Sequence, residues 1–149
     1  MKKRLKGLLS ILCACFLLTG CIAASETPPP EDIVLIPEKL FIAQTNDIYY
    51  NSEDYLGKTI RYEGMFKTYG GYEGSEKYYA VVRYGPGCCG DDGSAGFEVT
   101  WKEPYPKEDE WVEATGVLEL YEENGTAYLR LALTELEVLP IRGAEFVAQ

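Results

Sequence analysis

The chain has 149 residues, of which 24 are acidic and 14 basic, so its net charge at neutral pH is −10. A surface this acidic repels phosphate backbones, which proteins bind through Lys and Arg, and we therefore expect no nucleic-acid partner. Cationic partners stay open, namely metal ions, basic peptides or a positively charged face of a membrane protein. The alternative is that the charge only keeps an exported domain soluble.

The N-terminal residues have the pattern of a lipoprotein signal peptide. Basic residues precede the apolar run Leu8–Leu18, which is too short to cross a bilayer as a permanent helix. The run ends in Leu18-Thr19-Gly20-Cys21, which resembles the lipobox of bacterial lipoproteins, where cleavage falls before an acylated cysteine. We therefore expect a signal peptide over 1–20, lipidation of Cys21 and a lipid anchor on the extracytoplasmic face of the cell membrane. An ordinary cleaved signal with an incidental cysteine is the alternative.

The mature part divides into a tether and one domain. Cleavage would remove four basic residues and no acidic one, which takes the net charge to −14. Residues 21–37 contain three consecutive prolines and little to bury, which predicts a flexible tether. Residues 38–149 suffice for one compact domain and not for two. Their many Tyr, Val, Leu and Thr residues and recurrent glycines predict a mainly β structure.

One helix and five strands are predicted within this domain. Apolar positions in Glu38–Tyr50 suit a helix that packs on one side, and a single turn ending at Gly57 follows. Alternating apolar residues predict strands over Thr59–Thr68, Tyr78–Tyr84, Gly96–Trp101, Trp111–Tyr121 and Ala127–Leu139. Asn124-Gly125 is typical of a two-residue hairpin connection between the last two strands. Beyond Leu133 the alternation of the last strand slips its phase.

These elements predict an all-β fold, a small five-stranded OB-like barrel with an N-terminal helical segment. Glycines at mid-strand suit the bends of a small barrel, and a small open sandwich is the alternative. An OB barrel usually has a helix between its third and fourth strands, but the connection Lys102–Glu110 is too short for one. We expect the helical segment Glu38–Tyr50 to cover the open barrel end instead. Fold alone does not determine function.

The segment Tyr84–Gly93 is the most distinctive chemically, because it contains two thiols, two carboxylates and four glycines. If it forms a loop, Cys88, Cys89 and Asp92, with Asp91 as a substitute, supply three ligands suited to zinc or copper. Adjacent cysteines lack the two-residue spacer of a zinc knuckle. The alternative is structural, with one thiol packed in the core and the carboxylates holding a turn. Thiol redox activity is a further alternative, although no Cys-x-x-Cys spacing is present.

Tyrosines gather around the second predicted strand and are candidates for a partner-binding face. We select Tyr72, Tyr78 and Tyr84 for this role, with Tyr69 and Tyr79 nearby. Core packing is the alternative for at least half of them. The chain has no histidine, so no Ser-His-Asp arrangement is possible, and no phosphate-binding glycine loop followed by lysine occurs. We therefore expect a protein that is not an enzyme.

The cysteine segment also carries a family resemblance. The run Cys88–Val99, followed by Trp111-Val112 and Gly116, resembles the C-terminal domain of a bacterial family described as two-subunit permeases. That domain has a Cys-Cys-Ala-Ala-Asp-Ala motif before a glycine and a strand, then a Trp-x-x-Val-x-Gly strand. Matching positions are Cys88, Cys89, Asp92 and Gly96, whereas Gly90, Asp91 and Gly93 replace alanines. The similarity covers about Tyr55–Leu139 and implies an OB-like extracytoplasmic module of unknown function beside a membrane protein, with metal handling as one role.

The sequence therefore predicts a membrane-anchored extracytoplasmic lipoprotein that acts as a non-enzymatic binding or accessory module for a membrane protein. A zinc- or copper-binding protein is the first alternative, and a thiol oxidoreductase is the second.

Overall fold

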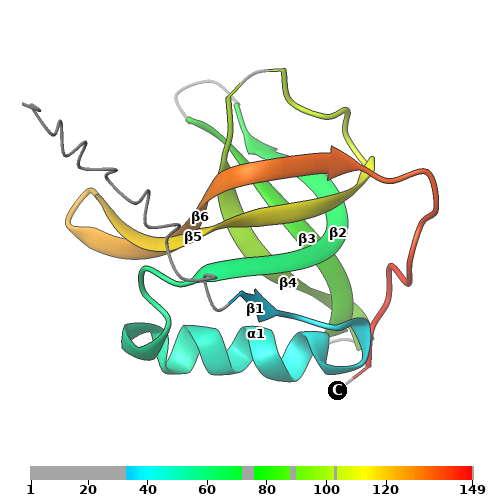
Figure 1. Cartoon of the computed structure of the whole chain (residues 1–149), viewed down its shortest axis with the longest axis horizontal. Helices are drawn as coiled ribbons and strands as arrows, with labels where there is room; N and C mark the ends of the chain where they lie inside the picture. The colour runs from blue at the N-terminus through cyan, green and yellow to red at the C-terminus, as the bar shows by residue number, and fades with distance from the viewer. Residues whose placement is uncertain (1–32, 72–75, 88–89, 103, 149) are drawn as a thin grey trace, which may run out of the picture.

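The computed structural model describes residues 33–71, 76–87, 90–102 and 104–148. The predicted signal peptide, Cys21 and most of the predicted tether lie outside these ranges. The elements are β1 (Val34–Leu35), a 3-10 turn (Glu38–Leu40), α1 (Phe41–Tyr50), a second 3-10 turn (Ser52–Asp54), β2 (Thr59–Gly70), β3 (Lys77–Gly87), β4 (Gly90–Thr100), β5 (Trp111–Glu123) and β6 (Thr126–Val138) (Figure 1).

Five of the strands close into a barrel. Their order is β2–β3–β4–β6–β5, and β2 pairs again with β5 to complete the circle. Every pair is antiparallel except β4 with β6, which run parallel over three residues. The short strand β1 adds to β2 in parallel. The predicted all-β class and the five-stranded barrel are confirmed, and the open sandwich is excluded.

The barrel interior is filled by every second residue of the strands, as the pleat requires. The buried side chains are Ile60, Tyr62, Phe66, Val81, Phe97, Val99, Val112, Ala114, Leu118 and Leu131. The turn at Asn124 and Gly125 has the positive φ angles predicted for a two-residue hairpin connection. The predicted phase slip in β6 is also present, because Thr115 pairs with Glu135 but Gly116 pairs with Leu133.

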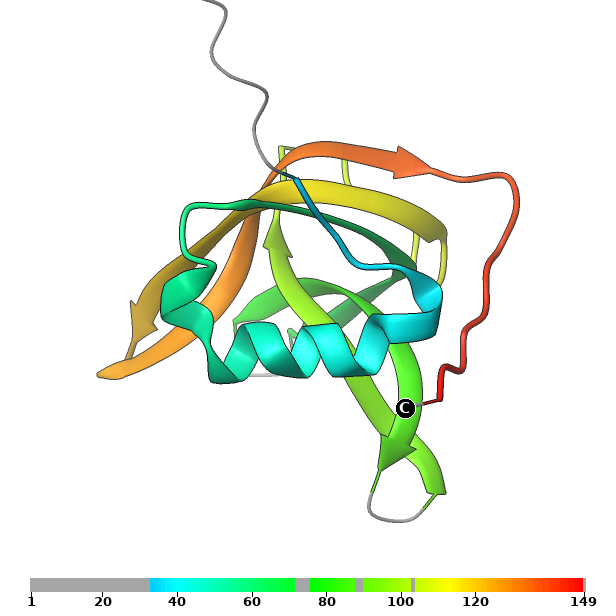
Figure 2. The ribbon, with the colours of Figure 1, turned by 60° about the horizontal axis from the view of Figure 1, so that its bottom comes forward.

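The helix α1 covers one end of the barrel, as Figures 1 and 2 show. Its Phe41 and Ile48 are fully buried and join the barrel core, together with Ile42 at 8% exposure. Tyr49, near the end of the helix, stacks on Phe97 with ring centroids 5.2 Å apart. The expectation that this segment covers the barrel end is therefore met, and the described residues between β4 and β5 contain no helix.

Two boundaries differ from those predicted. β1 precedes the expected domain start at residue 38, and the Ile36 amide, beside it, donates to the Arg61 carbonyl oxygen at 3.0 Å. Strand β3 continues past the predicted end at Tyr84 to Gly87, and β4 begins at Gly90, within the predicted loop Cys88–Gly93, with Gly85 opposite Gly93 and Gly87 opposite Gly90. The loop prediction was wrong from Gly90 onward because glycines carry no side chains, so the alternation that marks a strand is missing there.

Gly96 of β4 lies directly against the backbone of β3 at Val81 and Val82. Its φ is +146°, and a Cβ at this position would lie 2.1 Å from the Val81 carbonyl oxygen. That oxygen also accepts a hydrogen bond from the buried Tyr62 hydroxyl at 2.8 Å, and the hydroxyl accepts one from the Phe97 amide at 3.2 Å. A glycine here lets one tyrosine join β2, β3 and β4 inside the barrel.

Arg83 is buried where β2 and β3 separate, with 2% of the residue exposed. The pairing of β3 with β2 ends at Val82 and Met65. Beyond that point the Arg83 Nε donates to the Glu63 carbonyl oxygen at 2.8 Å. The guanidinium also lies over the rings of Phe41 and Trp111, at 5.2 and 4.7 Å. The side chain thus continues the contact between the two strands after their ladder has ended.

The same guanidinium holds the segment that follows β6. Its Nη1 donates to the Ala144 carbonyl oxygen at 3.1 Å and to the Glu38 carboxylate at 2.9 Å. The Ala144 amide donates to that carboxylate at 3.1 Å. Farther on, the Tyr84 amide donates to the Glu145 carbonyl oxygen, and the Val147 amide donates to the Tyr84 carbonyl oxygen. Residues 144–147 are thereby added to the edge of β3.

Replacing Gly96 with Ala should lower the free energy of unfolding by about 3 kcal/mol, because the new Cβ meets backbone and φ is unfavourable. Denaturant unfolding of the mature protein measures the loss. Gly57→Ala is the matched control, since φ is +79° there but nothing lies within 4 Å of the added atom. It should lose about 1 kcal/mol. Equal losses would show that the approach to Val81 does not require glycine.

The Glu38 carboxylate predicts an acid-sensitive contribution to stability. Its pKa lies below the ordinary value of 4.5, mainly because Arg83 donates a hydrogen bond to it. The unfolded chain therefore takes up this proton at higher pH than the folded chain, and the contribution is lost as pH falls below about 4.5. We expect the unfolding free energy of Glu38→Gln to depend less on pH in that range. A Glu53→Gln control with the same reduced dependence would contradict the assignment.

Candidate functional site

The structure leaves the predicted metal ligands largely untested. Cys88 and Cys89 lie outside the described residues, and only the backbone of Asp91 and Asp92 is described, in β4. The pairing of Gly87 with Gly90 brings the two strands together on either side of the cysteine pair. Within the described ranges, no group of three possible ligands is positioned to hold a metal ion. Zinc or copper binding by this segment stays a prediction, as does thiol redox activity.

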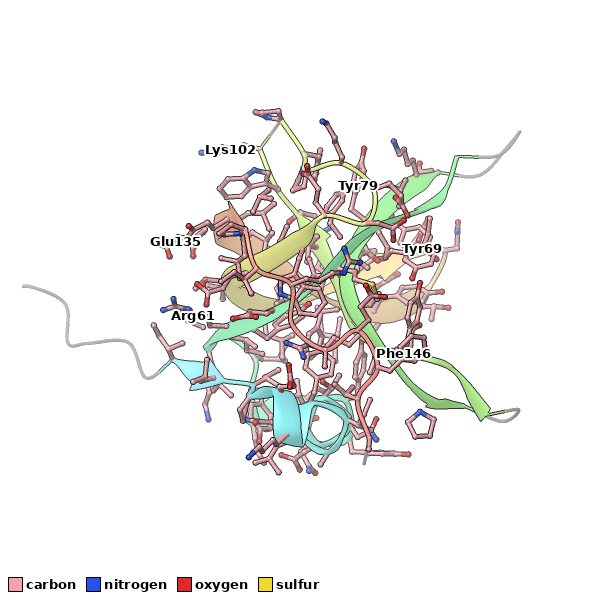
Figure 3. All side chains as sticks on the ribbon, turned by 90° about the vertical axis from the view of Figure 1, so that its right-hand side faces the viewer. Arg61, Tyr69, Tyr79, Lys102, Glu135 and Phe146 are labelled. Atoms are coloured by element: carbon pink, nitrogen blue, oxygen red, sulfur yellow. The ribbon has the colours of Figure 1, made fainter. Side chains whose placement is uncertain are left out.

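The predicted partner-binding tyrosines lie in different surroundings. Tyr78 is 46% exposed and stacks on Tyr69, with centroids 5.3 Å apart. Tyr84, six residues along β3, is half-buried against Phe146 of the C-terminal segment at 5.3 Å. Figure 3 shows Tyr69 and Phe146 on the same side of the barrel. Tyr72 lies outside the described residues. The structure thus makes Tyr84 a packing residue of the C-terminal segment and leaves Tyr78 at the surface.

A groove of about 1020 Å³ lies between the start of β3 and the β5–β6 hairpin, which projects from the barrel in Figure 1. We call it the tyrosine groove. Its lining residues are Glu76–Tyr79, Glu98–Thr100, Tyr105, Tyr121–Asn124, Tyr128 and Arg130. Strands β3 and β4 form one wall, and the hairpin forms the other. Tyr78 is the predicted partner-binding residue that lines it.

Stacked rings build both walls of the tyrosine groove. On one side Tyr79 stacks on Tyr105 at 3.9 Å and on Phe66 at 5.6 Å. The connection that carries Tyr105 is fixed in turn, because the Trp101 amide donates to the Tyr105 hydroxyl at 3.3 Å. On the hairpin, Tyr121 stacks on its cross-strand partner Tyr128 at 5.6 Å. These contacts hold the aromatic walls in place before any ligand binds.

Charged groups along the groove are arranged around the rings. The Tyr121 hydroxyl donates to Glu98 at 2.6 Å across the groove. Burial of the phenol and, to a smaller extent, its hydrogen bond to Glu98 raise the pKa of Tyr121 above its usual range. The phenol therefore stays protonated. The Arg130 guanidinium lies 4.6 Å from the centroid of the Tyr121 ring and pairs with Glu119 at 2.7 Å. The groove therefore combines aromatic surface with fixed carboxylates.

Most of the groove was missed at the level of sequence. Tyr105 occurs in a proline-bearing connection with no local signal of its role. Tyr121 and Tyr128 did have a local signal, because Tyr121 lies three residues before Asn124 and Tyr128 lies three residues after Gly125. In a two-residue hairpin that spacing makes them cross-strand neighbours, as the register confirms. The hairpin wall of the groove could therefore be predicted from the sequence, but the opposite wall could not.

A family model described as the DUF1980 C-terminal domain matches residues 24–141. The chain belongs to this family. The match includes β1, α1 and the whole barrel, and is consistent with the resemblance to the permease-associated domain, although it starts well before Tyr55. The family is one of unknown function. No curated protein and no solved structure matches the chain. No helix in the described part of the chain is long and apolar enough to span a bilayer.

The metal hypothesis for Cys88, Cys89 and Asp92 makes a direct prediction. Mature protein purified anaerobically without chelator should contain near-stoichiometric zinc or copper by elemental analysis, because two thiolates and a carboxylate suit these ions. The double variant Cys88→Ser, Cys89→Ser should lose the metal and keep its β-sheet circular dichroism. Metal-free protein with two titratable thiols would contradict the hypothesis.

Proposed function

We propose that this protein is a non-enzymatic binding module, anchored by a lipid on Cys21 to the outer face of the cell membrane, that contacts a membrane protein through the tyrosine groove. The observation that carries the proposal is the groove itself, in which exposed tyrosines are held by stacking on a closed barrel. Aromatic residues are enriched where proteins bind one another, since they give a large contact area and lose little conformational entropy.

The exposed rings provide the contact surface. Tyr78 and Tyr128 expose 46% and 45% of their surface, and each stacks on one neighbour. Their remaining surface is available to a partner. Because the neighbouring rings already restrict these two side chains, binding would cost little further side-chain entropy, which favours affinity. This is the behaviour of a preformed docking surface.

The anchor would keep the groove close to membrane partners. Eleven residues separate Cys21 from Ile33, and even a fully extended chain of this length spans at most about 40 Å. A domain held this close to the membrane surface meets a membrane protein at a raised effective concentration. Modest affinity at the groove is then sufficient for a lasting complex.

Site-specific cross-linking tests the proposal. A photoactivatable residue at Tyr128 should cross-link to a membrane protein in intact cells, because this ring faces the partner. The same residue at Glu135, which lies at the opposite side of the view from Tyr69 in Figure 3, should give no such product. Cys21→Ser should release the protein from the membrane fraction and abolish the cross-link. Equal cross-linking from both positions, or none from Tyr128, would contradict the proposal.

A further inference from the structure

We propose that the occupant of the tyrosine groove is an extended protein segment that carries Lys and Arg side chains. This inference rests on the proposed function, because it specifies the chemistry of the partner segment. It follows from three properties of the groove: its rings already accept cations, its size suits a chain segment, and carboxylates without an ion pair lie on both walls. Among the described residues, the three exposed carboxylates of this kind outnumber the one cation of the groove without an ion pair, Lys77.

The groove's own cations show how its rings bind positive charge. Arg130 lies over Tyr121 at 4.6 Å, and Lys77 lies over Tyr79 at 5.1 Å. The negative face of an aromatic ring attracts a cation, and the attraction strengthens as water is removed. Two rings of the groove are thus engaged by cations from the same chain. Tyr78 and Tyr128 present comparable rings with nearly half of their surface exposed.

The carboxylates of the groove are only partly neutralised. Glu98 accepts the hydrogen bond of Tyr121, and Arg130 is paired with Glu119. Glu76, Glu122 and Glu123 are exposed and have no ion pair within the described part of the chain. Glu76 precedes β3 on one wall, whereas the other two end β5 on the hairpin. Cations spaced along an occupant would meet carboxylates on both sides.

The dimensions of the groove favour a chain segment over a small ligand. Its volume of about 1020 Å³ is at the upper limit of ordinary small-molecule sites, and it is open along a hairpin instead of enclosed. A neutral sugar chain would also stack on tyrosines, but it would leave the unpaired carboxylates without a charged partner. An acidic segment would be repelled. The charges therefore select a basic peptide.

Fluorescence anisotropy with labelled decapeptides tests this inference on the mature lipidated protein in detergent micelles. The probes are alternating Gly-Arg, alternating Gly-Ser and alternating Gly-Glu peptides, and a neutral chitin oligosaccharide serves as a competitor. We expect the Gly-Arg peptide to bind at least about tenfold more tightly than the other two, and its affinity to fall with added salt. The oligosaccharide should not displace it.

Matched triple variants locate the binding site. Glu76→Gln, Glu122→Gln, Glu123→Gln should weaken binding of the Gly-Arg peptide about tenfold, since three carboxylates are lost from the groove. Glu53→Gln, Glu135→Gln, Glu137→Gln removes the same charge from exposed positions elsewhere and should change the affinity less than about twofold. Tyr128→Leu keeps an apolar side chain but removes a ring face, and should weaken binding severalfold.

Two outcomes would overturn the inference. Equal weakening by both triple variants would mean that overall acidity attracts the peptide. Equal affinity for the Gly-Ser peptide, or displacement by the oligosaccharide, would mean that the groove binds uncharged chains. Neither result would contradict the proposed function, which depends on cross-linking from Tyr128. Conversely, specific Gly-Arg binding without that cross-link would support the recognition chemistry and contradict the membrane partner.

Discussion

The burial of one charged side chain, Arg83, organises the part of the molecule where the barrel ladder is incomplete. A buried guanidinium is tolerated only if its donors are satisfied, and here the donors reach Glu63, Glu38 and Ala144. These partners belong to β2, to the turn before α1 and to the segment after β6. One side chain therefore links the turn before α1 and the segment after β6 to β2 and β3, at the point where the pairing of these two strands has ended. Its contacts with the rings of Phe41 and Trp111 extend the same junction into the core.

The two ends of the barrel are closed in different ways. At one end α1 lies beside the Arg83 junction and covers the barrel core, with Phe41 and Ile48 fully buried. At the other end lies the connection between β4 and β5 (Figure 1). Tyr105 in this connection stacks on Tyr79 of β3. The rings that seal this end also form a wall of the tyrosine groove. The aromatic packing of this barrel end is thus continuous with the wall of the groove.

Local patterns in the sequence were sufficient for most of the barrel. Alternation identified the strands around Ile60 and Leu131, and Asn124-Gly125 identified the hairpin. The slip beyond Leu133 anticipated the irregular pairing opposite Gly116. These predictions are correct because each depends on the period of a strand or on the φ angles of a turn. Both are properties of residues that are neighbours in the sequence.

Features that depend on distant residues were not accessible in this way. β1 is only two residues long, so it has no pattern before it pairs with β2. The glycines of Tyr84–Gly93 conceal a strand because they have no side chains. Nothing in the residues around Arg83 marks its burial, since a charged residue is expected at the surface. The tyrosine groove needs β3, β4 and the hairpin together, and the register of β4 with β6 joins them across about thirty residues of sequence.

The attachment of residues 144–147 to β3 also sets the order in which the domain can be completed during synthesis. A chain that emerges from the ribosome N-terminus first presents α1, β2 and β3 long before the segment that satisfies Arg83. Until residue 147 has emerged, the guanidinium lacks its Ala144 acceptor and the edge of β3 at Tyr84 is uncovered. The domain therefore completes its folding only after nearly the whole chain has been synthesised. Before that point, the incomplete barrel presents an unpaired strand edge of the kind that makes folding intermediates prone to aggregation.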